Sequence, residues 1–387
     1  MAIVNRIAAF QDDMAAWRRE IHAHPETAFE EHRTSDFVAA KLKSFGLEVH
    51  RGLAGTGVVA TLKRGDGPVI GLRADMDALH IHEKNGFAHK SQNSGKMHAC
   101  GHDGHTTMLL GAARYLSEAG KFKGTVHFIF QPAEENEGGG RKMIEDGLFK
   151  LFPVEQVYGM HNWPGMPAGR FAVKSGPMMA AFDIFEIIVR GKGSHAAMPH
   201  TGIDPVVTAA QIVLGLQTIS SRSTHPVDAA VVSVTQIHAG DTWNVIPAEV
   251  VLRGTTRSFR PEVRDNIEKS IPRIAEGIAA AHGATVSVRY ERRYPPTINE
   301  AGATEIAARV ATDVVGEAQV ERNPTPTMGA EDFAFMLEQK PGCYVWIGNG
   351  PSDNERVLHS PHYDFNDEIL PFGASYWARL VETTLAA

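Results

Sequence analysis

Residues 98–105 read HACGHDGH and place three histidines and one of the chain's two cysteines within eight positions. On a helix, Cys100 and His102 would point in nearly opposite directions, because residues two apart do not share a face. They converge only in an extended or turn segment, which the two glycines of the motif allow. A helix that begins at about 103–106 would direct its positive end at the thiol and lower the thiol pKa. A thiolate beside an imidazole suits Zn²⁺ and related transition metals.

Two other interpretations of this motif stay open. Cys100 could be an inert buried thiol, with the histidines as capping or core groups. Cys100 could also be a nucleophile that uses His102 or His105 as its base. A metal site, by contrast, requires further ligands elsewhere in the chain.

Further candidate ligands follow two predicted strands. Glu134 and Glu135 come after VHFIFQP, and His161 comes after VYGM. Each of these is weak by itself, but together they lie at carboxyl ends of strands, where open α/β sheets bind ligands. Adjacent side chains on an extended segment diverge, so one glutamate can bind metal while the other faces a water molecule.

Acidic residues and histidines at two more places extend this set. Asp75 and Asp77 follow the predicted strand in GLRADMDAL. They are either helix or turn caps, or carboxylates that hold a metal-bound histidine. Near the C-terminus, LHSPHYDF supplies His359 and His362, either of which could complete a metal site.

The composition limits the domain count and the class of partner. A single hydrophobic core usually serves a chain of at most about 250–300 residues. This chain has 387 residues, so two domains are expected. The net charge of −7 argues against nucleic acid or an anionic membrane and leaves a small-molecule partner. We expect no signal peptide or membrane anchor, hence a cytoplasmic location with both cysteines as free thiols.

The order of predicted elements indicates an insertion. Two helices are expected in the first 45 residues, and strands and helices then alternate, which predicts an α/β fold with a mixed, mostly parallel sheet. From about residue 180 the order becomes β-α-β-β-α-β, typical of a ferredoxin-like α+β unit. We therefore predict a discontinuous domain of residues 1–178 and 293–387, interrupted by an inserted domain of residues 179–292.

Eight motifs occur in this order along the chain: RADMDAL, HACGHDGHT, QPAEE, MHNWPG, GSHAAMPH, NVIPAE, MGAEDF and LHSPHYDF. From about Trp17 to Phe365 the chain thereby resembles the aminoacylase and hippurate-hydrolase branch of the M20 metallopeptidase family. The resemblance implies a metal-dependent amidohydrolase that cleaves the amide bond of N-acyl amino acids. It also implies that the inserted domain serves as a lid and forms a homodimer.

Matching positions to the family's motifs implies roles for individual residues. Glu134 matches the general base, and Asp75 matches the carboxylate that orients a ligand. Three residues of the inserted domain match substrate contacts that are often made across a dimer interface: His195, Asn244 and Arg257. The implied ligands of two divalent ions (Zn, Mn, Co or Ni) are Cys100, His102, Glu135, His161 and His359.

One departure from the wider family concerns two of these positions. Most members hold a histidine ligand and a bridging aspartate where this chain has Arg73 and Cys100. The bridge implied here is therefore a thiolate.

In the implied mechanism, Glu134 takes a proton from water and delivers it to the departing amine. His195 would donate a hydrogen bond to the developing oxyanion, and Arg257 would bind the substrate carboxylate. Three alternatives stay open: a dipeptidase or exopeptidase with the same metal chemistry, a thiol hydrolase, and a non-catalytic metal-binding protein.

Overall fold

The chain divides into two structural units, and the second is inserted in the first. The structure, a computed structural model, describes residues 3–352 and 355–386. The first unit comprises the chain up to Met178, Ile298–Thr325, and the chain from Asp332 onward. The second unit comprises Met179–Thr297 and Pro326–Glu331.

The end of the inserted unit lies later than the predicted residue 292. Strand β13 (Thr285–Tyr294) extends past that point, and its last residue pairs with Phe182. A hydrogen bond from the Ala180 N–H to the Thr327 carbonyl, 3.1 Å long, also connects the 326–331 segment to this unit. Backbone pairing between distant segments, which the sequence pattern does not encode, decides this boundary.

The first unit contains an eight-stranded mixed sheet of order β1-β2-β4-β3-β5-β16-β6-β15. The inner strands β4, β3, β5 and β16 run parallel to one another. They are almost continuously buried, as expected for parallel strands that are covered on both faces. The strands are β1 (Glu48–Leu53), β2 (Gly57–Arg64), β3 (Val69–Asp75), β4 (Gly124–Gln131), β5 (Gln156–Pro164), β6 (Phe171–Ala172), β15 (Val320–Glu321) and β16 (Gly342–Gly350).

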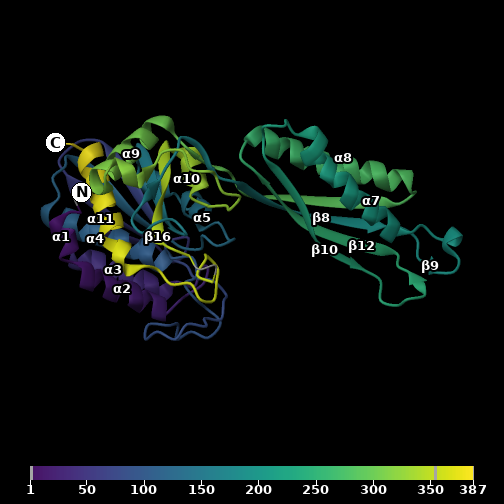
Figure 1. Cartoon of the computed structure of the whole chain (residues 1–387), viewed down its shortest axis with the longest axis horizontal. Coiled ribbons are helices and arrows are strands. Elements are labelled where there is room, and N and C mark those ends of the chain that lie inside the picture. The colour runs from purple at the N-terminus through teal and green to yellow at the C-terminus, as the bar shows by residue number, and fades with distance from the viewer. Residues whose placement is uncertain (1–2, 353–354, 387) are drawn as a thin grey trace. The chain divides into compact units, whose positions relative to one another are not determined.

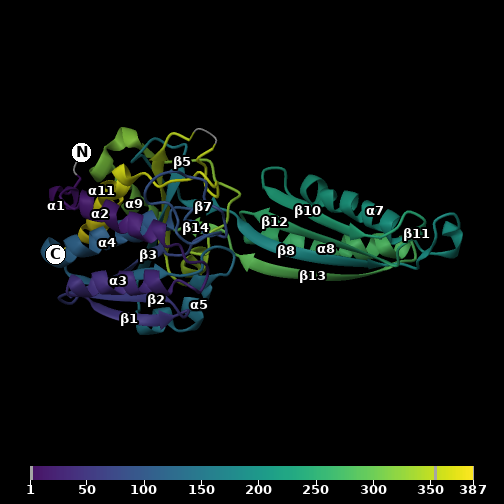
Figure 2. The same cartoon turned by 90° about the horizontal axis from the view of Figure 1, so that it is seen from below.

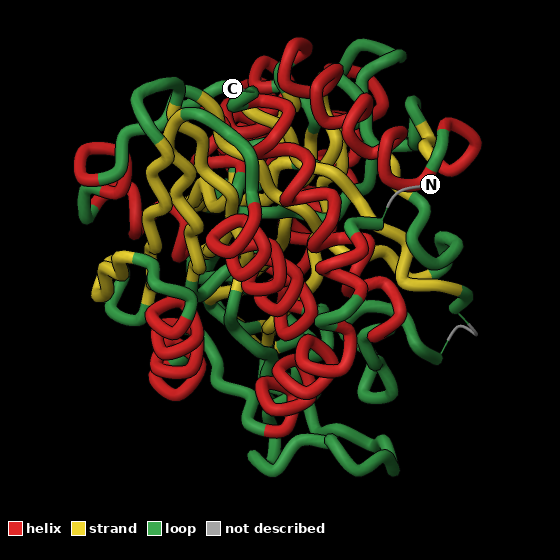
Figure 3. The backbone as a smooth tube through the Cα atoms, turned by 90° about the vertical axis from the view of Figure 1, so that its left-hand side faces the viewer, coloured by secondary structure: helices red, strands yellow, loops and turns green. Residues whose placement is uncertain are grey.

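Helices pack over this sheet, as Figure 3 shows for the red and yellow segments of the first unit. Helix α4 is the most deeply buried, and Gly111 allows its close approach to α2, because an added Cβ would lie 2.4 Å from Met14 Sδ. The helices are α1 (Asn5–Ala8), α2 (Gln11–Ala23), α3 (His32–Ser44), α4 (His102–Ala119), α5 (Gly139–Glu145), α6 (Leu148–Leu151), α9 (Ala301–Val315), α10 (Ala334–Gln339) and α11 (Leu370–Thr384).

The second unit contains an antiparallel sheet of order β10-β12-β8-β13. Helices α7 and α8 lie on one face of it in Figure 1, and Figure 2 views the opposite face. Burial alternates along β8, so that Phe185, Ile187 and Val189 join the core beneath the helices. The elements are β8 (Ala181–Arg190), α7 (Pro205–Thr218), β10 (Ala230–Ala239), β12 (Glu249–Ser258), α8 (Pro261–Ala281) and β13.

This β-α-β-β-α-β order and the mixed sheet of the first unit confirm the predicted fold class. Two short strands, β7 (Gly176–Met179) and β14 (Thr297–Asn299), pair with each other where the chain passes between the units. A second short pair, β9 (Ser194–His195) with β11 (Val245–Ile246), lies within the inserted unit. None of the described helices combines the length and apolar character needed to cross a bilayer.

Candidate metal centre

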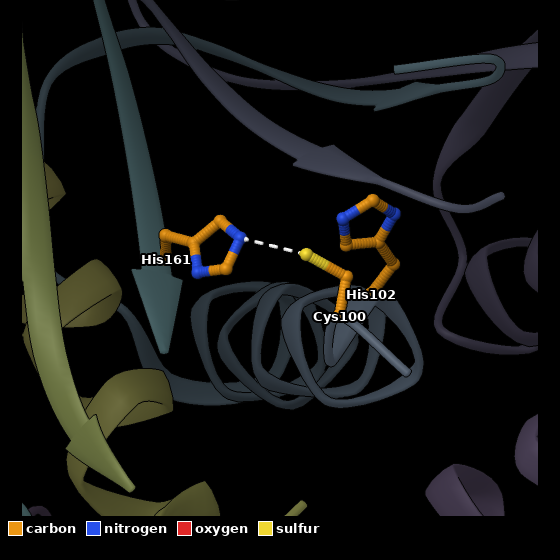
Figure 4. Close-up of side chains that lie close together, drawn as sticks. All are labelled: Cys100, His102 and His161. Atoms are coloured by element: carbon orange, nitrogen blue, oxygen red, sulfur yellow. Dashed lines mark hydrogen bonds between the residues drawn. The ribbon is translucent and has the colours of Figure 1, made fainter. Parts of the chain in front are cut away.

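Cys100 and His102 converge because helix α4 begins between them. Gly101 adopts a left-handed φ of 96° and ends the non-helical segment that carries Cys100, while His102 is the first helical residue. Cys100 Sγ lies 3.3 Å from Nε2 of His161, which lies within β5 and not after it as predicted, and Figure 4 shows the thiol and this imidazole pointing toward each other. Zinc bonds of about 2.3 Å to sulfur and 2.0 Å to nitrogen at a tetrahedral angle would separate these atoms by roughly 3.5 Å. The observed spacing therefore fits a shared metal ion.

In both histidines, hydrogen bonds to Nδ1 fix the orientation of the ring and leave Nε2 open. His161 Nδ1 donates to the Asn162 carbonyl at 2.6 Å, which leaves Nε2 facing the thiol. His102 Nδ1 lies 2.9 Å from the Asp77 carbonyl and 3.2 Å from Asp77 Oδ1. His102 Nε2 is buried and has no hydrogen-bond partner among the described residues. Such an arrangement, with one nitrogen anchored and the other open, is typical of metal-binding histidines.

The two adjacent glutamates reach the same histidine. One oxygen of each carboxylate and a His102 nitrogen lie within 4.8 Å of one another. The expected divergence of an extended segment does not apply here, because Ala133 adopts a φ of 54° and strand β4 has already ended. The Asp332 N–H donates to the Glu134 carboxylate (Oε1) at 3.3 Å. The backbone of the next residue is fixed by a different group, because the Glu135 N–H donates to Asp77 Oδ2.

His359 joins this group from the loop after β16. Its Nε2 lies 3.1 Å from Glu135 Oε1, and ligand atoms of Cys100, Glu135 and His359 lie within 4.8 Å of one another. The His359 N–H donates to the Ala99 carbonyl at 2.7 Å, which connects the loop to the segment before the thiol. His362 belongs to none of the potential metal-binding groups found among the described residues.

The two aspartates after β3 have different partners. Asp75 accepts from His105 Nδ1 at 2.7 Å and from Arg73 at 2.8 Å, and it lies 3.7 Å from His102 Nε2. Asp77 contacts His102 Nδ1 and accepts from the Glu135 N–H at 2.9 Å. The family resemblance implied Asp75 as the carboxylate that orients a ligand, whereas in the structure Asp77 contacts the Nδ1 atom of His102 and Asp75 contacts His105.

His105, for which the sequence predicts only a possible role as the base of a thiol nucleophile, lies against the His161 ring and donates to Asp75. It lies three residues after His102 on α4, a spacing that places both rings on one face of the helix. This spacing is the sequence signal that could have identified His105 as a residue of the site. Arg73 pairs with Asp75 and Asp332, each at 2.8 Å.

The charges of the site favour a cation. Burial and then the carboxylates of Glu135, Glu134 and Asp75 raise the pKa of the Cys100 thiol well above its ordinary value. This direction is opposite to the predicted lowering by the helix end, because burial first, and then the neighbouring carboxylates, disfavour the thiolate. Burial lowers the pKa of His102, but Asp75 and Asp77 outweigh it and raise this pKa to about 10. Burial keeps the pKa of His161 well below its ordinary value.

The inserted unit separates its three predicted substrate residues into two groups. His195 on β9 pairs with Val245 on β11, and the Ala196 N–H donates to the Asn244 carbonyl at 3.0 Å. His195 and Asn244 are therefore neighbours. Arg257 lies eight residues into β12, about 26 Å from the strand end that adjoins this pair.

Arg257 makes no ion pair among the described residues, although the Asp183 carboxylate acts on it electrostatically. Its guanidinium lies 4.3 Å from the centroid of the Phe182 ring. Burial lowers its pKa. Arg253, four residues earlier on the same strand, is paired with Glu186 at 2.7 Å.

Comparison with known proteins identifies the family. Residues 71–383 match the family described as Peptidase family M20/M25/M40. The chain belongs to this family. It is 41% identical to a hippurate hydrolase of Campylobacter jejuni, with 98% of each chain covered. It is 40% identical to an N-acetylcysteine deacetylase of Bacillus subtilis, with 97% of this chain and 98% of the relative covered.

A solved structure extends the likeness of this M20 protein to three dimensions. The Bacillus subtilis YXEP protein, described as a dinuclear metal binding peptidase from the M20 family, superposes with a TM-score of 0.85. It is 38% identical, with 98% of this chain and 99% of that chain covered. The predicted family is confirmed, and the predicted amidohydrolase activity agrees with these relatives.

Proposed function

We propose that this M20 protein hydrolyses the amide bond of N-acyl amino acids, of the hippurate or N-acetyl type, with two divalent metal ions. The observation that carries the proposal is the buried, unpartnered Nε2 of His102 beside the Cys100–His161 pair and the surrounding carboxylates. The bound ions supply polarisation of the amide carbonyl and acidification of a water molecule. The residues that would hold them are Cys100, His102, Glu135, His161 and His359.

Glu134 serves as the proton shuttle of the proposed reaction. Its carboxylate is 6% exposed and lies close to His102, so it is shielded from bulk water beside the ligand group. It accepts a proton from the attacking water and donates it to the departing amine. Asp77 orients His102, and Asp75 holds His105 against the ligand His161 from behind.

The inserted unit binds the substrate in this proposal. Arg257 anchors the carboxylate of the amino-acid half, which its lack of an ion pair supports. His195 and Asn244 contact the reacting amide. Arg257 lies roughly 26 Å along β12 from the strand end that adjoins His195 and Asn244, which is longer than an N-acyl amino acid, so in this proposal the two contacts to one substrate come from two inserted units.

A homodimer resolves this separation, because the partner subunit can supply the second group. Exposed apolar side chains on α7 and the edge strand β10 offer a surface for such pairing: Leu214 is 71% exposed and Ile237 is 59% exposed. Cys100 and Cys343 are both free and buried, which suits the cytoplasmic location included in this proposal.

The test is a substrate and metal screen. Protein treated with a chelator is reloaded with Zn²⁺, Mn²⁺, Co²⁺ or Ni²⁺ and assayed on hippurate, N-acetylcysteine and unmodified dipeptides. We expect turnover of the acylated substrates only after metal is restored. Turnover confined to dipeptides would reassign the protein as a dipeptidase. Full activity in the presence of the chelator would support a thiol hydrolase.

A further inference from the structure

Asn162 connects three segments that carry residues of the candidate metal centre. Its side-chain Nδ2 donates to the Cys100 carbonyl at 2.6 Å, and its own carbonyl accepts from His161 Nδ1 at 2.6 Å. Its backbone N–H donates to His105 Nε2 at 2.9 Å. One fully buried residue of β5 thus joins its neighbour His161 to the thiol segment and to helix α4.

The orientation of the Asn162 amide is determined by its partners. The Tyr363 hydroxyl donates to Asn162 Oδ1 at 2.7 Å, so that Nδ2 must face the Cys100 carbonyl. The Asn162 amide and the Tyr363 hydroxyl pack tightly against Gly101, because a Cβ at Gly101 would lie 2.1 Å from Asn162 Nδ2 and 2.6 Å from the Tyr363 hydroxyl. A buried polar network in which every member has a partner is rigid.

We propose that Asn162 is a positioning residue of the metal centre, which keeps the Cys100 thiol and the His161 imidazole at the spacing that a shared metal ion requires. The spacing of 3.3 Å between Sγ and Nε2 depends on where the main chain of residue 100 lies relative to β5. The hydrogen bond from Nδ2 to the Cys100 carbonyl sets that relation directly. This inference rests on the proposed function.

Substitutions of Asn162 distinguish the hydrogen bond that its side chain donates to Cys100 from the one that it accepts from Tyr363. Asn162→Asp keeps the size of the side chain and the acceptor for Tyr363, but it replaces the donor with an oxygen that repels the Cys100 carbonyl. Asn162→Ala removes every hydrogen bond of the side chain, including the 3.1 Å contact between Nδ2 and His105 Nε2. Changes to residues that orient metal ligands typically weaken metal affinity by about 10–100-fold, and we expect both variants to fall in this range.

The experiment uses Co²⁺ as a spectroscopic probe of the full-length protein. Chelator-treated wild type and both Asn162 variants are titrated with Co²⁺, and the Kd is read together with the near-ultraviolet charge-transfer absorption of a thiolate-bound Co²⁺. We expect a weaker Kd and a displaced or diminished band per bound ion in both variants. Cys100→Ser provides the reference spectrum without a thiolate.

Asn299→Ala is the matched control. Asn299 is also a buried asparagine of the first unit, and its Nδ2 donates to the Lys174 and Tyr344 carbonyls at 3.0 and 2.9 Å. Its loss removes comparable hydrogen bonds without touching the metal-site residues. We expect this variant to lose stability and to keep the Co²⁺ affinity and band of the wild type.

Tyr363→Phe is a milder variant that keeps the Asn162 amide and removes only the group that orients it. We expect a smaller change in the same direction. Wild-type Co²⁺ affinity and band in the Asn162 and Tyr363 variants would overturn the positioning role and leave the proposed function standing. An equal loss in Asn299→Ala would also overturn it, because the effect would then be general destabilisation. A wild type without a thiolate band would overturn the metal-centre proposal itself.

Discussion

Asp77 Oδ1 lies 3.2 Å from His102 Nδ1, and the other oxygen of the same carboxylate accepts from the Glu135 N–H at 2.9 Å. One side chain therefore orients the ring of one proposed ligand and the main chain of another. Asp75, two residues earlier, makes its shortest contact with His105 instead. Their substitution should have different consequences.

Asp77→Asn should weaken metal affinity by about 10–100-fold with a modest loss of stability, because it removes the charge that orients His102. Asp75→Asn should mainly destabilise the fold, since it breaks a buried pair with Arg73, a change that typically costs about 3–5 kcal/mol. Metal titration and urea unfolding of both variants check this. A larger affinity loss in Asp75→Asn would restore Asp75 as the orienting carboxylate.

Glu134→Gln should retain metal and lose turnover, whereas Glu135→Gln should lose metal. The first change removes the proton shuttle, which typically costs at least about 10² to 10⁴-fold in rate. The second removes a charge that faces His359 and the thiol. Elemental analysis and turnover are measured on both proteins. Equal metal loss in the two variants, or near-normal turnover of Glu134→Gln, would contradict the assignment.

Mixed dimers test whether the active site is shared between subunits. Glu134→Gln disables the first unit and leaves the inserted unit intact, while His195→Ala does the reverse. Each variant alone should be nearly inactive, but a mixture should regain activity through heterodimers that combine one intact first unit with one intact inserted unit. Regained activity that depends on exchange of subunits supports the shared site. No recovery in demonstrated heterodimers would mean that each subunit contains its own complete site.

His22 should make stability depend on pH. Burial lowers its pKa, but Asp103 and Glu83 outweigh burial and raise it to about 9. Because the folded pKa lies above the ordinary 6.5, the stabilisation is fully present below pH 6.5 and is lost as pH rises through 9. The shift corresponds to on the order of 3 kcal/mol of unfolding free energy.

Urea unfolding of chelator-treated protein at pH 6.5 and 9 measures this contribution. His22→Gln should lack that part of the pH dependence. His127→Gln is the control, since burial lowers the pKa of His127 to about 4 and the residue stays uncharged across the window. A wild-type slope in His22→Gln would refute the role of His22.

The sequence alone determined the local geometry of the centre and the order of the elements. Glycines on either side of His102 required a turn and then a helix start, and polar residues after apolar strands had to meet at one edge of the sheet. The period of two in the inserted segment, interrupted by two helical stretches, was sufficient for the ferredoxin-like order. These features depend on neighbouring residues and on strand direction, and both can be read from the sequence pattern.

Only the tertiary structure decided which carboxylate meets which histidine, the direction of the Cys100 pKa shift, and the separation of Arg257 from His195. Each depends on side chains that are far apart in the chain but close in space, or on the register of paired strands. Burial and Coulomb interactions act through space over a few ångströms, so residues with the same local pattern acquire different partners and different charges once the chain is folded.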